Sequence, residues 1–395
     1  MNNVAILGST GSVGEHTLDV IARHPDRFRV FALGAHRNVE KLAEQCARFS
    51  VPYAAIADVS LVGRLRDALR ARKANTQVLG GADGLKEIAG HPEVHSVMAA
   101  IVGAAGLPST LAAARAGKRL LLANKESLVM AGPLLMETVR SSGATLLPID
   151  SEHNAVFQCL PRDAVAGVAP PGVKRILLTA SGGPFVDADR ARLEKVTPDE
   201  ACAHPNWVMG RKISVDSATL MNKGLEFIEA CLLFGVTPQQ VEVVIHRESI
   251  VHSLVEYVDG SVLAQLGAPD MRTPIAHALA WPERVSSGVQ SLDLVKVGML
   301  RFEAPDLRRF PALGLAQQAA QEGGSRPAAL NAANEVAVSA FLEGGLNFAR
   351  IPAVIESVMA ATTGGEIRDI ADVLAADAEA RERASAFIRP RAVHA

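Results

Sequence analysis

Short apolar runs alternate with stretches of helical spacing through the first 150 residues. After the first run, Leu18, Ile21 and Ala22 fall on one side of a helix. The runs are predicted to be buried strands over residues 4–8, 29–38, 51–58, 76–81, 97–103, 119–129 and 145–150. Strands that alternate with helices predict an α/β fold with a doubly wound, Rossmann-like parallel sheet. Ligands of such sheets bind beyond the carboxyl ends of the strands.

One stretch, from Ser96 to Ala114, has no charged residue and is similar in length and polarity to a membrane-spanning helix. Gly103, Gly106 and Pro108 interrupt it. We predict a buried strand over Val97–Val102, then a glycine turn and a helix, because a parallel strand covered on both faces is apolar throughout.

The pattern changes after residue 150. Residues 177–185 and 241–267 contain further strands, and Asp259–Gly260 predicts a tight hairpin turn. Because a hairpin joins antiparallel strands, we expect a separate α+β domain with a mixed sheet here. Residues 286–310 have no clear period and are interpreted as a linker. Alanine-rich amphipathic segments from Ala312 onward predict a small helical domain.

Two helices are predicted in the middle segment. Thr197 as N-cap, with Pro198 next, is a helix-start signal. Residues 214–235 predict one continuous helix with an apolar core stripe and a polar stripe beside it. The core stripe is Met221, Leu225, Ile228 and Leu232, and the polar stripe is Asn222, Glu226 and Glu229. A solvated face is the default interpretation of such a polar stripe.

Composition and charge narrow the function classes. The 395 residues include 40 basic and 42 acidic side chains, so no global field attracts nucleic acid or an anionic membrane. Any phosphate must therefore be held locally. The four cysteines (Cys46, Cys159, Cys202 and Cys231) form no CxxC pair, which favours a reduced, cytoplasmic protein over a disulfide scaffold or zinc site. A strand pattern that begins by Val4 leaves no room for a signal peptide.

Glycines follow the first predicted strand. Gly8, Gly11 and Gly14 precede the first helix, and this strand, turn and helix order presents free amides to a pyrophosphate. The spacing is GxxGxxG rather than GxGxxG, so a tight turn with close helix packing is the alternative. The second strand ends in His36, Arg37 and Asn38 rather than in an acidic residue. A cation and an amide suit a 2′-phosphate and favour NADP, although a solvated basic turn also explains Arg37.

Polar side chains follow two more predicted strands. Asn124, Lys125 and Glu126 lie at one strand end, and Asp150 and Glu152 lie at another. Asp150 suits a helix N-cap, and acidic residues favour the first helical turn. The alternative is a hard-metal site, which the position at a strand end favours.

The middle segment carries donors that suit a phosphate. Ser181, with Gly182 and Gly183, ends a strand and could cradle an anion or form an ordinary turn. Ser217, Asn222 and Lys223 add donors and a cation. Trp207 and Met209 lie in a glycine-containing loop that is interpreted either as a lid or as a loop held to the core.

A third metal ligand could come from the same helix. Glu226 and Glu229 are both candidates, and spacing does not choose between them. Three carboxylates suit Mg²⁺ or Mn²⁺ rather than zinc. His246, His252 and His277 are single histidines on apolar segments and are interpreted as structural.

Eight segments together resemble the 1-deoxy-D-xylulose 5-phosphate reductoisomerase family. They run in order through the chain: ILGSTGSVG, AAIVGAAGL, LLANKESLV, DSEHNAVFQ, SGGPF, HPNWVMGRKISVDSATLMNKGLEFIEA, LAQLGAPDMRTPIAHALAWP and LNAANEVAV. The resemblance implies rearrangement of 1-deoxy-D-xylulose 5-phosphate to a branched aldehyde. It also implies reduction of that aldehyde by NADPH to 2-C-methyl-D-erythritol 4-phosphate, early in non-mevalonate isoprenoid synthesis.

The resemblance also implies roles for individual residues. The metal, Mn²⁺, Mg²⁺ or Co²⁺, would be held by Asp150, Glu152 and Glu226. The reacting end of the substrate would meet Lys125, Ser151 and Glu152, of which Lys125 and Glu152 are the catalytic candidates. The phosphate end would meet Ser181, His204, Ser217, Asn222 and Lys223, and Trp207 would pack on the substrate. NADPH would contact Thr10, Gly11, Ser12, Val13, Arg37, Asn38, Asn124, Glu126 and Gly210.

The same resemblance implies a domain plan and a homodimer. Residues 1–150 would bind NADPH, and residues 151–285 would form the catalytic and dimerisation domain, with a flap around 204–214. A linker over 286–311 and a helical domain over 312–395 would follow.

One departure from the family pattern lies beside Arg37. The family commonly has glycine at the position of His36, so the local contacts to the 2′-phosphate are in question. Two rival functions also remain: another NADP-linked dehydrogenase that needs no metal and performs no rearrangement, and a non-catalytic nucleotide sensor.

Overall fold

The computed structural model describes residues 1–204, 207 and 210–389. They divide into two compact units. Unit 1 comprises Met1–Ser127, Leu135–Phe157 and Asp270–Ser291, and unit 2 comprises Leu128–Leu134, Gln158–Pro269 and Leu292–Ala395. Residues 270–291 therefore belong to the same unit as the N-terminal sheet, although residues 158–269, which directly precede them in the chain, belong to unit 2.

Unit 1 is built on one parallel sheet of seven strands, in the order β4-β3-β2-β1-β5-β6-β7. The strands are β1 (Asn2–Leu7), β2 (Phe28–Ala35), β3 (Tyr53–Ile56), β4 (Gln77–Gly80), β5 (Ser96–Ala99), β6 (Arg119–Leu122) and β7 (Thr145–Pro148). This order, which reverses direction beside β1, confirms the predicted doubly wound sheet.

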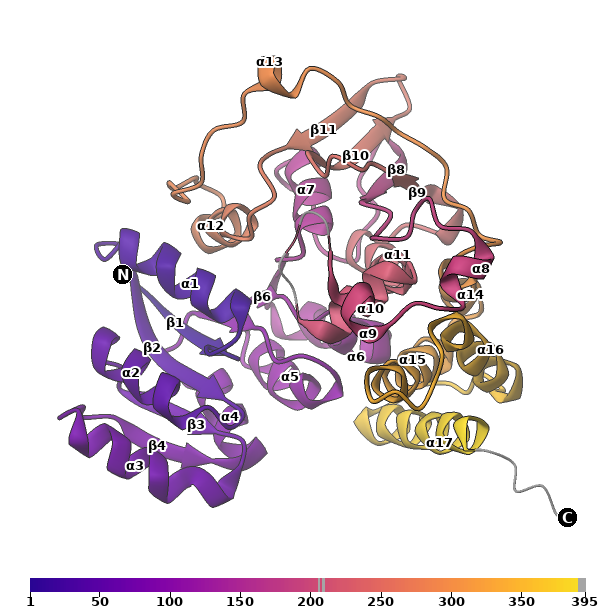
Figure 1. Cartoon of the computed structure of the whole chain (residues 1–395). Coiled ribbons are helices and arrows are strands. Elements are labelled where there is room, and N and C mark those ends of the chain that lie inside the picture. The colour runs from indigo at the N-terminus through magenta and orange to yellow at the C-terminus, as the bar shows by residue number, and fades with distance from the viewer. Residues whose placement is uncertain (205–206, 208–209, 390–395) are drawn as a thin grey trace, which may run out of the picture. The chain divides into compact units, whose positions relative to one another are not determined.

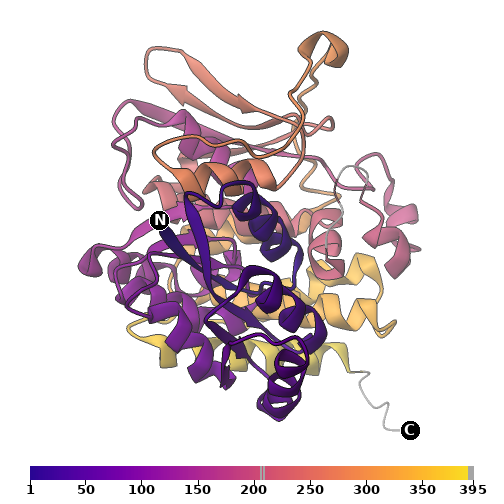
Figure 2. The same ribbon diagram turned by 90° about the vertical axis from the view of Figure 1, so that its left-hand side faces the viewer.

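Helices α1 to α6 connect these strands, α7 follows β7, and α12 joins the same unit from later in the chain (Figures 1 and 2). They are α1 (Ser12–Arg23), α2 (Val39–Phe49), α3 (Val62–Ala71), α4 (Gly81–Gly90), α5 (Leu107–Arg115), α6 (Lys125–Ser142), α7 (Ser151–Cys159) and α12 (Arg272–Ala280), with short 3-10 turns at Val59–Leu61 and Ala104–Gly106. One hydrophobic core joins Leu18 of α1, Leu42 of α2 and Ile275 of α12 to strand residues such as Ile6.

The uncharged stretch from Ser96 to Ala114 folds as strand, turn and helix, as its glycines predicted. The strand is shorter than expected, because β5 ends at Ala99 and Val102 is 59% exposed. In the part of the chain that the structure describes, no helix is both long enough and apolar enough to cross a membrane.

Unit 2 contains a mixed sheet of four strands in the order β11-β10-β8-β9. The strands are β8 (Val173–Ala180), β9 (Val241–Ile245), β10 (Val251–Tyr257) and β11 (Val262–Leu266). β8 and β9 are parallel, whereas β10 is antiparallel to both β8 and β11. The Asp259–Gly260 hairpin is present, and Gly260 supplies the positive φ of 88° that the turn requires.

The helix predicted over residues 214–235 is two helices, so that prediction was wrong. They are α10 (Arg211–Ala218) and α11 (Met221–Phe234). Leu220 between them has a left-handed φ of 61°. The Thr219 hydroxyl donates to the Asp216 carbonyl at 3.2 Å and accepts from the Met221 amide at 3.3 Å. These side-chain bonds take the place of the backbone ladder and allow the break.

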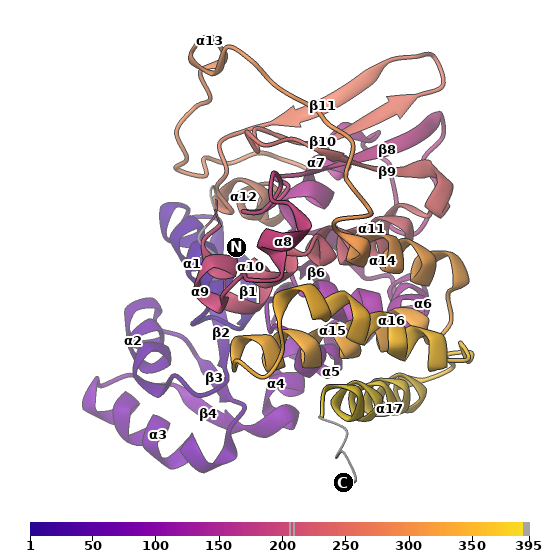
Figure 3. The ribbon, with the colours of Figure 1, turned by 45° about the vertical axis from the view of Figure 1, so that its right-hand side comes forward.

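Helices also make up the rest of unit 2, and the C-terminal ones follow the helical prediction (Figure 3). They are α8 (Arg190–Leu193), α9 (Pro198–Cys202), α13 (Leu294–Val297), α14 (Pro311–Glu322), α15 (Arg326–Leu342), α16 (Ile351–Ala361) and α17 (Ile370–Ile388), with 3-10 turns at Pro238–Gln240 and Phe348–Arg350. Thr197 caps α9 through a capping box with Glu200, as predicted. α15 contacts both α16 and α17.

The glycine turn after β1 generates a stability prediction. A Cβ on Gly14 would lie 2.5 Å from the Gly8 carbonyl oxygen and 2.5 Å from Ser9 Cα. These are backbone atoms, so Gly14→Ala should lower the free energy of unfolding by about 1–3 kcal/mol through overpacking. Gly63→Ala in α3 is the matched control, because a Cβ there meets no heavy atom within 4 Å. Thermal unfolding of both variants checks this, and equal melting temperatures would contradict it.

Candidate active site

The turn between β1 and α1 presents backbone amides. Gly8 has a φ of 88°, and the Gly8 and Ser9 amides both donate to the Gly34 carbonyl at 2.9 Å. Gly11 is the N-cap of α1 and brings no side chain to cap it. The first amides of a helix have no partner within the helix, and the helix dipole is positive there. The segment Thr10 to Val13, half-buried or exposed, therefore suits an anionic ligand.

The end of β2 places Arg37 at the surface beside Asp58. The Arg37 side chain is 69% exposed, and its Nε lies 3.2 Å from Asp58 Oδ2. Ser60 donates to Asp58 from its hydroxyl at 2.6 Å and lowers the pKa of that carboxyl, and the Arg37 charge adds to the effect. Asn38 caps α2 by accepting from the Lys41 amide at 3.2 Å. Asp58 was not among the predicted site residues, although it ends the predicted strand over 51–58.

The start of α6 is held by Asn124. Its Oδ1 accepts from the Ser127 amide at 2.6 Å, and its Nδ2 donates to the carbonyls of Ile101 and, at 3.0 Å, Gly103. The side chain is 2% exposed. Its hydrogen bonds therefore connect the loop after β5 to the first turn of α6.

The lysine after that cap meets the first of the two predicted carboxylates. Lys125 Nζ lies 2.8 Å from Asp150 Oδ2, and the two side chains are only 13% and 19% exposed. The partial burial strengthens this ion pair relative to one on the surface.

The start of α7 shows that the cap and ligand interpretations of Asp150 are compatible. The Asp150 carbonyl accepts from the Asn154 amide at 2.8 Å, so Asp150 is the residue at which the helix begins. Its carboxylate meanwhile pairs with Lys125. Ser151 donates to Glu152 Oε2 at 2.5 Å. Two carboxylates and a lysine amine are thus gathered at the ends of β6 and β7.

In unit 2, Ser181 and His204 lie together. His204 Nδ1 accepts from the Trp207 amide at 3.0 Å. Because an amide can only donate, the neutral ring carries its proton on Nε2, which lies 2.9 Å from Ser181 Oγ. Ser181 Oγ also accepts from the Gly183 amide at 3.2 Å.

The glycines after Ser181 allow close approach to α10. Gly182 and Gly183 have φ values of 84° and 69°. A Cβ on Gly183 would lie 2.8 Å from the Ser217 carbonyl oxygen. The loop of residues 181–183 therefore packs directly on the end of α10 that carries Ser217.

The two acids in the polar stripe of α11 are buried rather than solvated, whereas Asn222 is half-buried. Glu226 is 1% exposed and accepts from Asn222 Nδ2 and the Lys223 ammonium. Glu229 is also 1% exposed. Burial of a carboxylate requires such donors, because an uncompensated charge inside a protein is costly.

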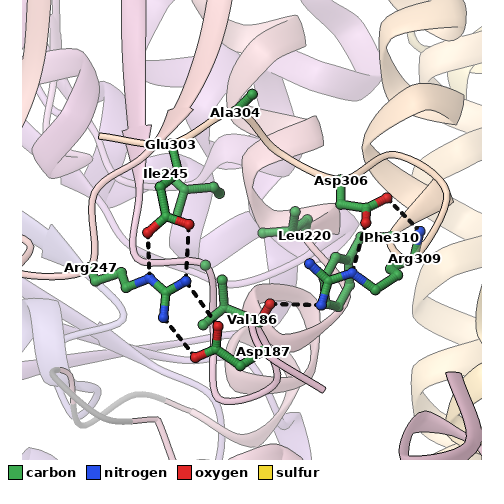
Figure 4. A pocket seen from close by; sticks show the side chains of 11 residues that line it. Val186, Asp187, Leu220, Ile245, Arg247, Glu303, Ala304, Asp306, Arg309 and Phe310 are labelled. Carbon is green, nitrogen blue, oxygen red and sulfur yellow. Dashed lines mark hydrogen bonds and ion pairs between the residues drawn. The ribbon is translucent and has the colours of Figure 1, made fainter. Parts of the chain in front are cut away.

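An ion network anchors the chain just after the glycine loop (Figure 4). Arg247 donates to Asp187 at 2.6 and 2.9 Å and to Glu303 at 2.9 and 3.0 Å. Arg309 donates to the carbonyls of Val186 at 2.9 Å and Ala188 at 3.0 Å. All of these residues except Ala188 line a pocket of about 110 Å³. The network was not predicted, because its members are spread over more than 100 residues.

Two of the single histidines on apolar segments, His246 and His277, have structural environments. His246 is fully buried, and its ring lies 2.9 Å from the Arg301 carbonyl and accepts from the Ile250 amide at 3.2 Å. Burial lowers the pKa of His277 to about 4, so this ring stays neutral at pH 7.

The predicted flap is described only in part. Pro205, Asn206, Val208 and Met209 lie outside the described residues. The Trp207 and His252 ring centroids are 6.3 Å apart. Gly210 is the N-cap of α10.

The sheet of unit 1 and the groups at its strand ends define a class of protein. A doubly wound parallel sheet with a glycine turn after its first strand is typical of nucleotide-binding proteins. The carboxylates and lysine at the strand ends of unit 1 add groups that can hold a cation or move a proton. The chain is an α/β enzyme of the Rossmann type.

The comparisons with known proteins identify its family. The model of 1-deoxy-D-xylulose 5-phosphate reductoisomerase matches residues 4–132, and two models of C-terminal domains of that enzyme match residues 146–234 and 266–383. The 1-deoxy-D-xylulose 5-phosphate reductoisomerase of Nitrosomonas eutropha is 59% identical over 392 residues, which cover 99% of this chain and 95% of that protein. The enzyme of Methylococcus capsulatus is 61% identical over 389 residues, covering 98% and 99%. The chain belongs to the 1-deoxy-D-xylulose 5-phosphate reductoisomerase family.

Solved structures agree with this assignment. A DOX-P reductoisomerase in complex with NADPH, fosmidomycin and magnesium is 48% identical and has a TM-score of 0.94, with 98% of each chain covered. The Zymomonas mobilis enzyme in complex with NADPH is 48% identical and has a TM-score of 0.90, with 98% of this chain and 99% of that chain covered.

The environment of Asn124 generates a prediction. Asn124→Ala removes an N-cap and leaves buried carbonyls without their donor, so it should lower the free energy of unfolding by about 2–4 kcal/mol. Asn347→Ala is the control, because Asn347 is exposed and its side chain makes no cap hydrogen bond. Thermal melts followed by circular dichroism compare the two, and a shift for Asn124→Ala no larger than for Asn347→Ala would refute the prediction.

Proposed function

We propose that this protein converts 1-deoxy-D-xylulose 5-phosphate to 2-C-methyl-D-erythritol 4-phosphate, using NADPH and a divalent metal ion, in non-mevalonate isoprenoid synthesis. The observation that carries the proposal is the relation to the family over 98–99% of the chain, which includes both units. A dehydrogenase without rearrangement or a nucleotide sensor would not need the carboxylates and phosphate donors described above.

The proposed metal ligands are Asp150, Glu152 and Glu226. Their carboxylate oxygens suit Mg²⁺ or Mn²⁺, with Co²⁺ as a third candidate, and the set contains no thiolate or imidazole. Asp150 and Glu226 each form an ion pair with a lysine, which shows that both carboxylates have a cation as a neighbour in the fold. When bound, the ion polarises the substrate carbonyl and stabilises negative charge on its oxygen.

Lys125 and Glu152 are proposed to act at the reacting end of the substrate. Lys125 Nζ, held 2.8 Å from Asp150, is a proton donor with a fixed position. Glu152, which accepts from Ser151, can receive a proton from a substrate hydroxyl. Ser151 orients this carboxylate and is proposed to touch the substrate as well.

The other end of the substrate is proposed to be held by donors from unit 2. They are Ser181, His204, Ser217, Asn222 and Lys223. The Nε2 proton of His204 and the hydroxyl of Ser181 are already aligned with each other, so both can turn toward phosphate oxygens with little reorganisation. Trp207 is proposed to pack on the substrate and exclude water.

NADPH is proposed to bind along the strand ends of unit 1. Thr10, Gly11, Ser12 and Val13 would meet its diphosphate, and Arg37 with Asn38 would meet the 2′-phosphate. The remaining proposed contacts are Asn124, Glu126 and Gly210. Asn124 would contact NADPH through its backbone carbonyl or the edge of its side-chain amide, because the hydrogen bonds of that side chain lie within the protein. The proposed domain plan assigns the cofactor domain to residues 1–150 and the catalytic domain to residues 151–285. Residues 286–311 are proposed as a linker and residues 312–395 as a C-terminal domain.

A homodimer is proposed from exposed apolar side chains of unit 2. β11 is an edge strand on which Val262 and Leu263 are 50% and 49% exposed. Val295, Met299 and Phe302 are also exposed. An apolar edge strand left uncovered invites pairing with another chain. The protein is proposed to act in the cytoplasm, without nucleic acid or membrane as a partner.

The proposed reaction predicts metal-dependent oxidation of NADPH. The absorbance of NADPH should fall on addition of 1-deoxy-D-xylulose 5-phosphate with Mn²⁺ present and should stop falling after chelation. A rate of NADPH oxidation that does not change on chelation would favour a dehydrogenase that needs no metal. No oxidation by folded protein would reject the proposed activity.

The metal ligands can be tested one by one in the same assay. Asp150→Asn and Glu226→Gln should each lower kcat/KM by about 100-fold or more, because a ligand charge is lost. Glu229→Gln is the matched control, since Glu229 is equally buried on the same helix. An effect of Glu229→Gln as large as that of Glu226→Gln would contradict the assignment of Glu226.

The proposed role of Arg37 predicts a change in cofactor preference. Arg37→Ala should raise KM for NADPH about tenfold, in line with loss of a charged hydrogen bond, and leave NADH kinetics unchanged. Arg64→Ala in α3 is the control, because Arg64 is a similarly exposed arginine paired with Glu40. Equal effects of Arg37→Ala on both cofactors would count against a 2′-phosphate contact.

A further inference from the structure

A buried carboxylate joins α10 to the C-terminal helices. Asp216 of α10 is 1% exposed, and its Oδ1 accepts from Asn334 Nδ2 of α15 at 2.8 Å. Its Oδ2 lies 2.9 Å from Lys212 Nζ. Asn334 is 0% exposed and lies 118 residues further along the chain. α10 and α15 are in contact (Figure 3).

The geometry of this contact is specific. A carboxylate oxygen can only accept a hydrogen bond, so Asn334 must present its NH₂ group to Asp216. Both groups are buried, so neither can exchange this hydrogen bond for one to bulk water. Loss of one partner therefore leaves a desolvated polar group, and the helix that carries it can relax only by moving.

The residue after Asp216 is Ser217, one of the proposed phosphate contacts. Gly183 lies against the Ser217 carbonyl so closely that a Cβ there would come within 2.8 Å. The position of α10 therefore sets both Ser217 and the support for the Ser181–Gly183 loop.

A second close contact joins the C-terminal helices to α11. A Cβ on Gly224 would lie 2.6 Å from Ala316 Cβ of α14. Asn222 and Lys223 precede Gly224 on α11, so both helices with proposed phosphate donors are supported by the C-terminal helices.

We propose that Asn334 is a positioning residue for the phosphate site: its hydrogen bond to Asp216 holds α10 in the register that presents Ser217. The C-terminal helical domain is thereby part of the active-site scaffold. The inference rests on the proposed function for the identity of the substrate, but the contact itself is independent of turnover.

Asn331 offers a matched control on the same helix. It is also 0% exposed, but its Nδ2 donates at 3.2 Å to Glu335, a residue of α15 itself. Asn331→Ala removes a buried amide whose hydrogen bond lies within α15 and leaves the bond between Asn334 and Asp216 in place. A general loss of core stability should affect both variants, whereas loss of phosphate positioning should affect only Asn334→Ala.

The first readout is steady-state kinetics of the full-length protein. Asn334→Ala should raise KM for 1-deoxy-D-xylulose 5-phosphate about tenfold, the effect of a hydrogen bond to a charged group, with KM for NADPH and kcat changed less than about threefold. Asn331→Ala should leave all three constants near those of the wild type even if its melting temperature falls. Equal KM values for the two variants would overturn the proposal.

The second readout is binding of inorganic phosphate, measured by titration calorimetry, which needs no turnover. Asn334→Ala should weaken it about fivefold or more relative to Asn331→Ala, and equal affinities would overturn the proposal. If the wild type fails to oxidise NADPH, the proposed reaction is rejected, and this titration still decides the role of Asn334. If Asn334→Ala does not fold, Asn334→Leu, which keeps the branched shape of the side chain but removes the donor to Asp216, takes its place and is judged by the same criterion.

Discussion

Buried carboxylates are the constraint on which the rest of this structure depends. Asp150, Asp216 and Glu226 are each withdrawn from water to a large degree, and each meets a lysine amine: Lys125, Lys212 and Lys223. Removal of a carboxylate from water costs free energy unless a cation and hydrogen-bond donors pair with it. The helices and strand ends that carry these lysines must therefore keep their positions, and groups able to bind phosphate or metal are fixed as a consequence.

The two units meet this constraint with different parts of their secondary structure. In unit 1, the turns between strands and helices position the polar groups. Gly11, Asn124 and Asp150 each lie where a helix begins, and the first amides of a helix need partners. In unit 2, the buried acids lie within helices and pair with lysines of the same helix, while the C-terminal helices add a donor, Asn334, to Asp216 and close packing beside Gly224. This explains why the C-terminal helices, which carry none of the proposed substrate contacts, can still bear on binding.

Much of the fold and part of the candidate site could be predicted. The alternation of apolar runs and helical stretches identified all seven strands of the parallel sheet, because a parallel strand buried on both faces is apolar throughout. The strand predicted over 119–129 was too long, because β6 ends at Leu122 and α6 begins at Lys125. The Asp259–Gly260 turn identified the hairpin for an equally local reason. Eight short segments were enough to recognise the family. The residue roles carried by that resemblance remain proposals, which the experiments above test.

The sequence by itself determined what depends on near neighbours: strand and helix periodicity, turn chemistry, caps and the motifs of the family. Tertiary structure alone decided the pairing of Arg37 with Asp58, the Arg247 network and the bond between Asp216 and Asn334. It also buried the two acids in the polar stripe of α11, which periodicity had suggested were solvated. These features join residues up to 123 positions apart. Periodicity records which face a side chain occupies, but only the folded chain determines which partner meets it there.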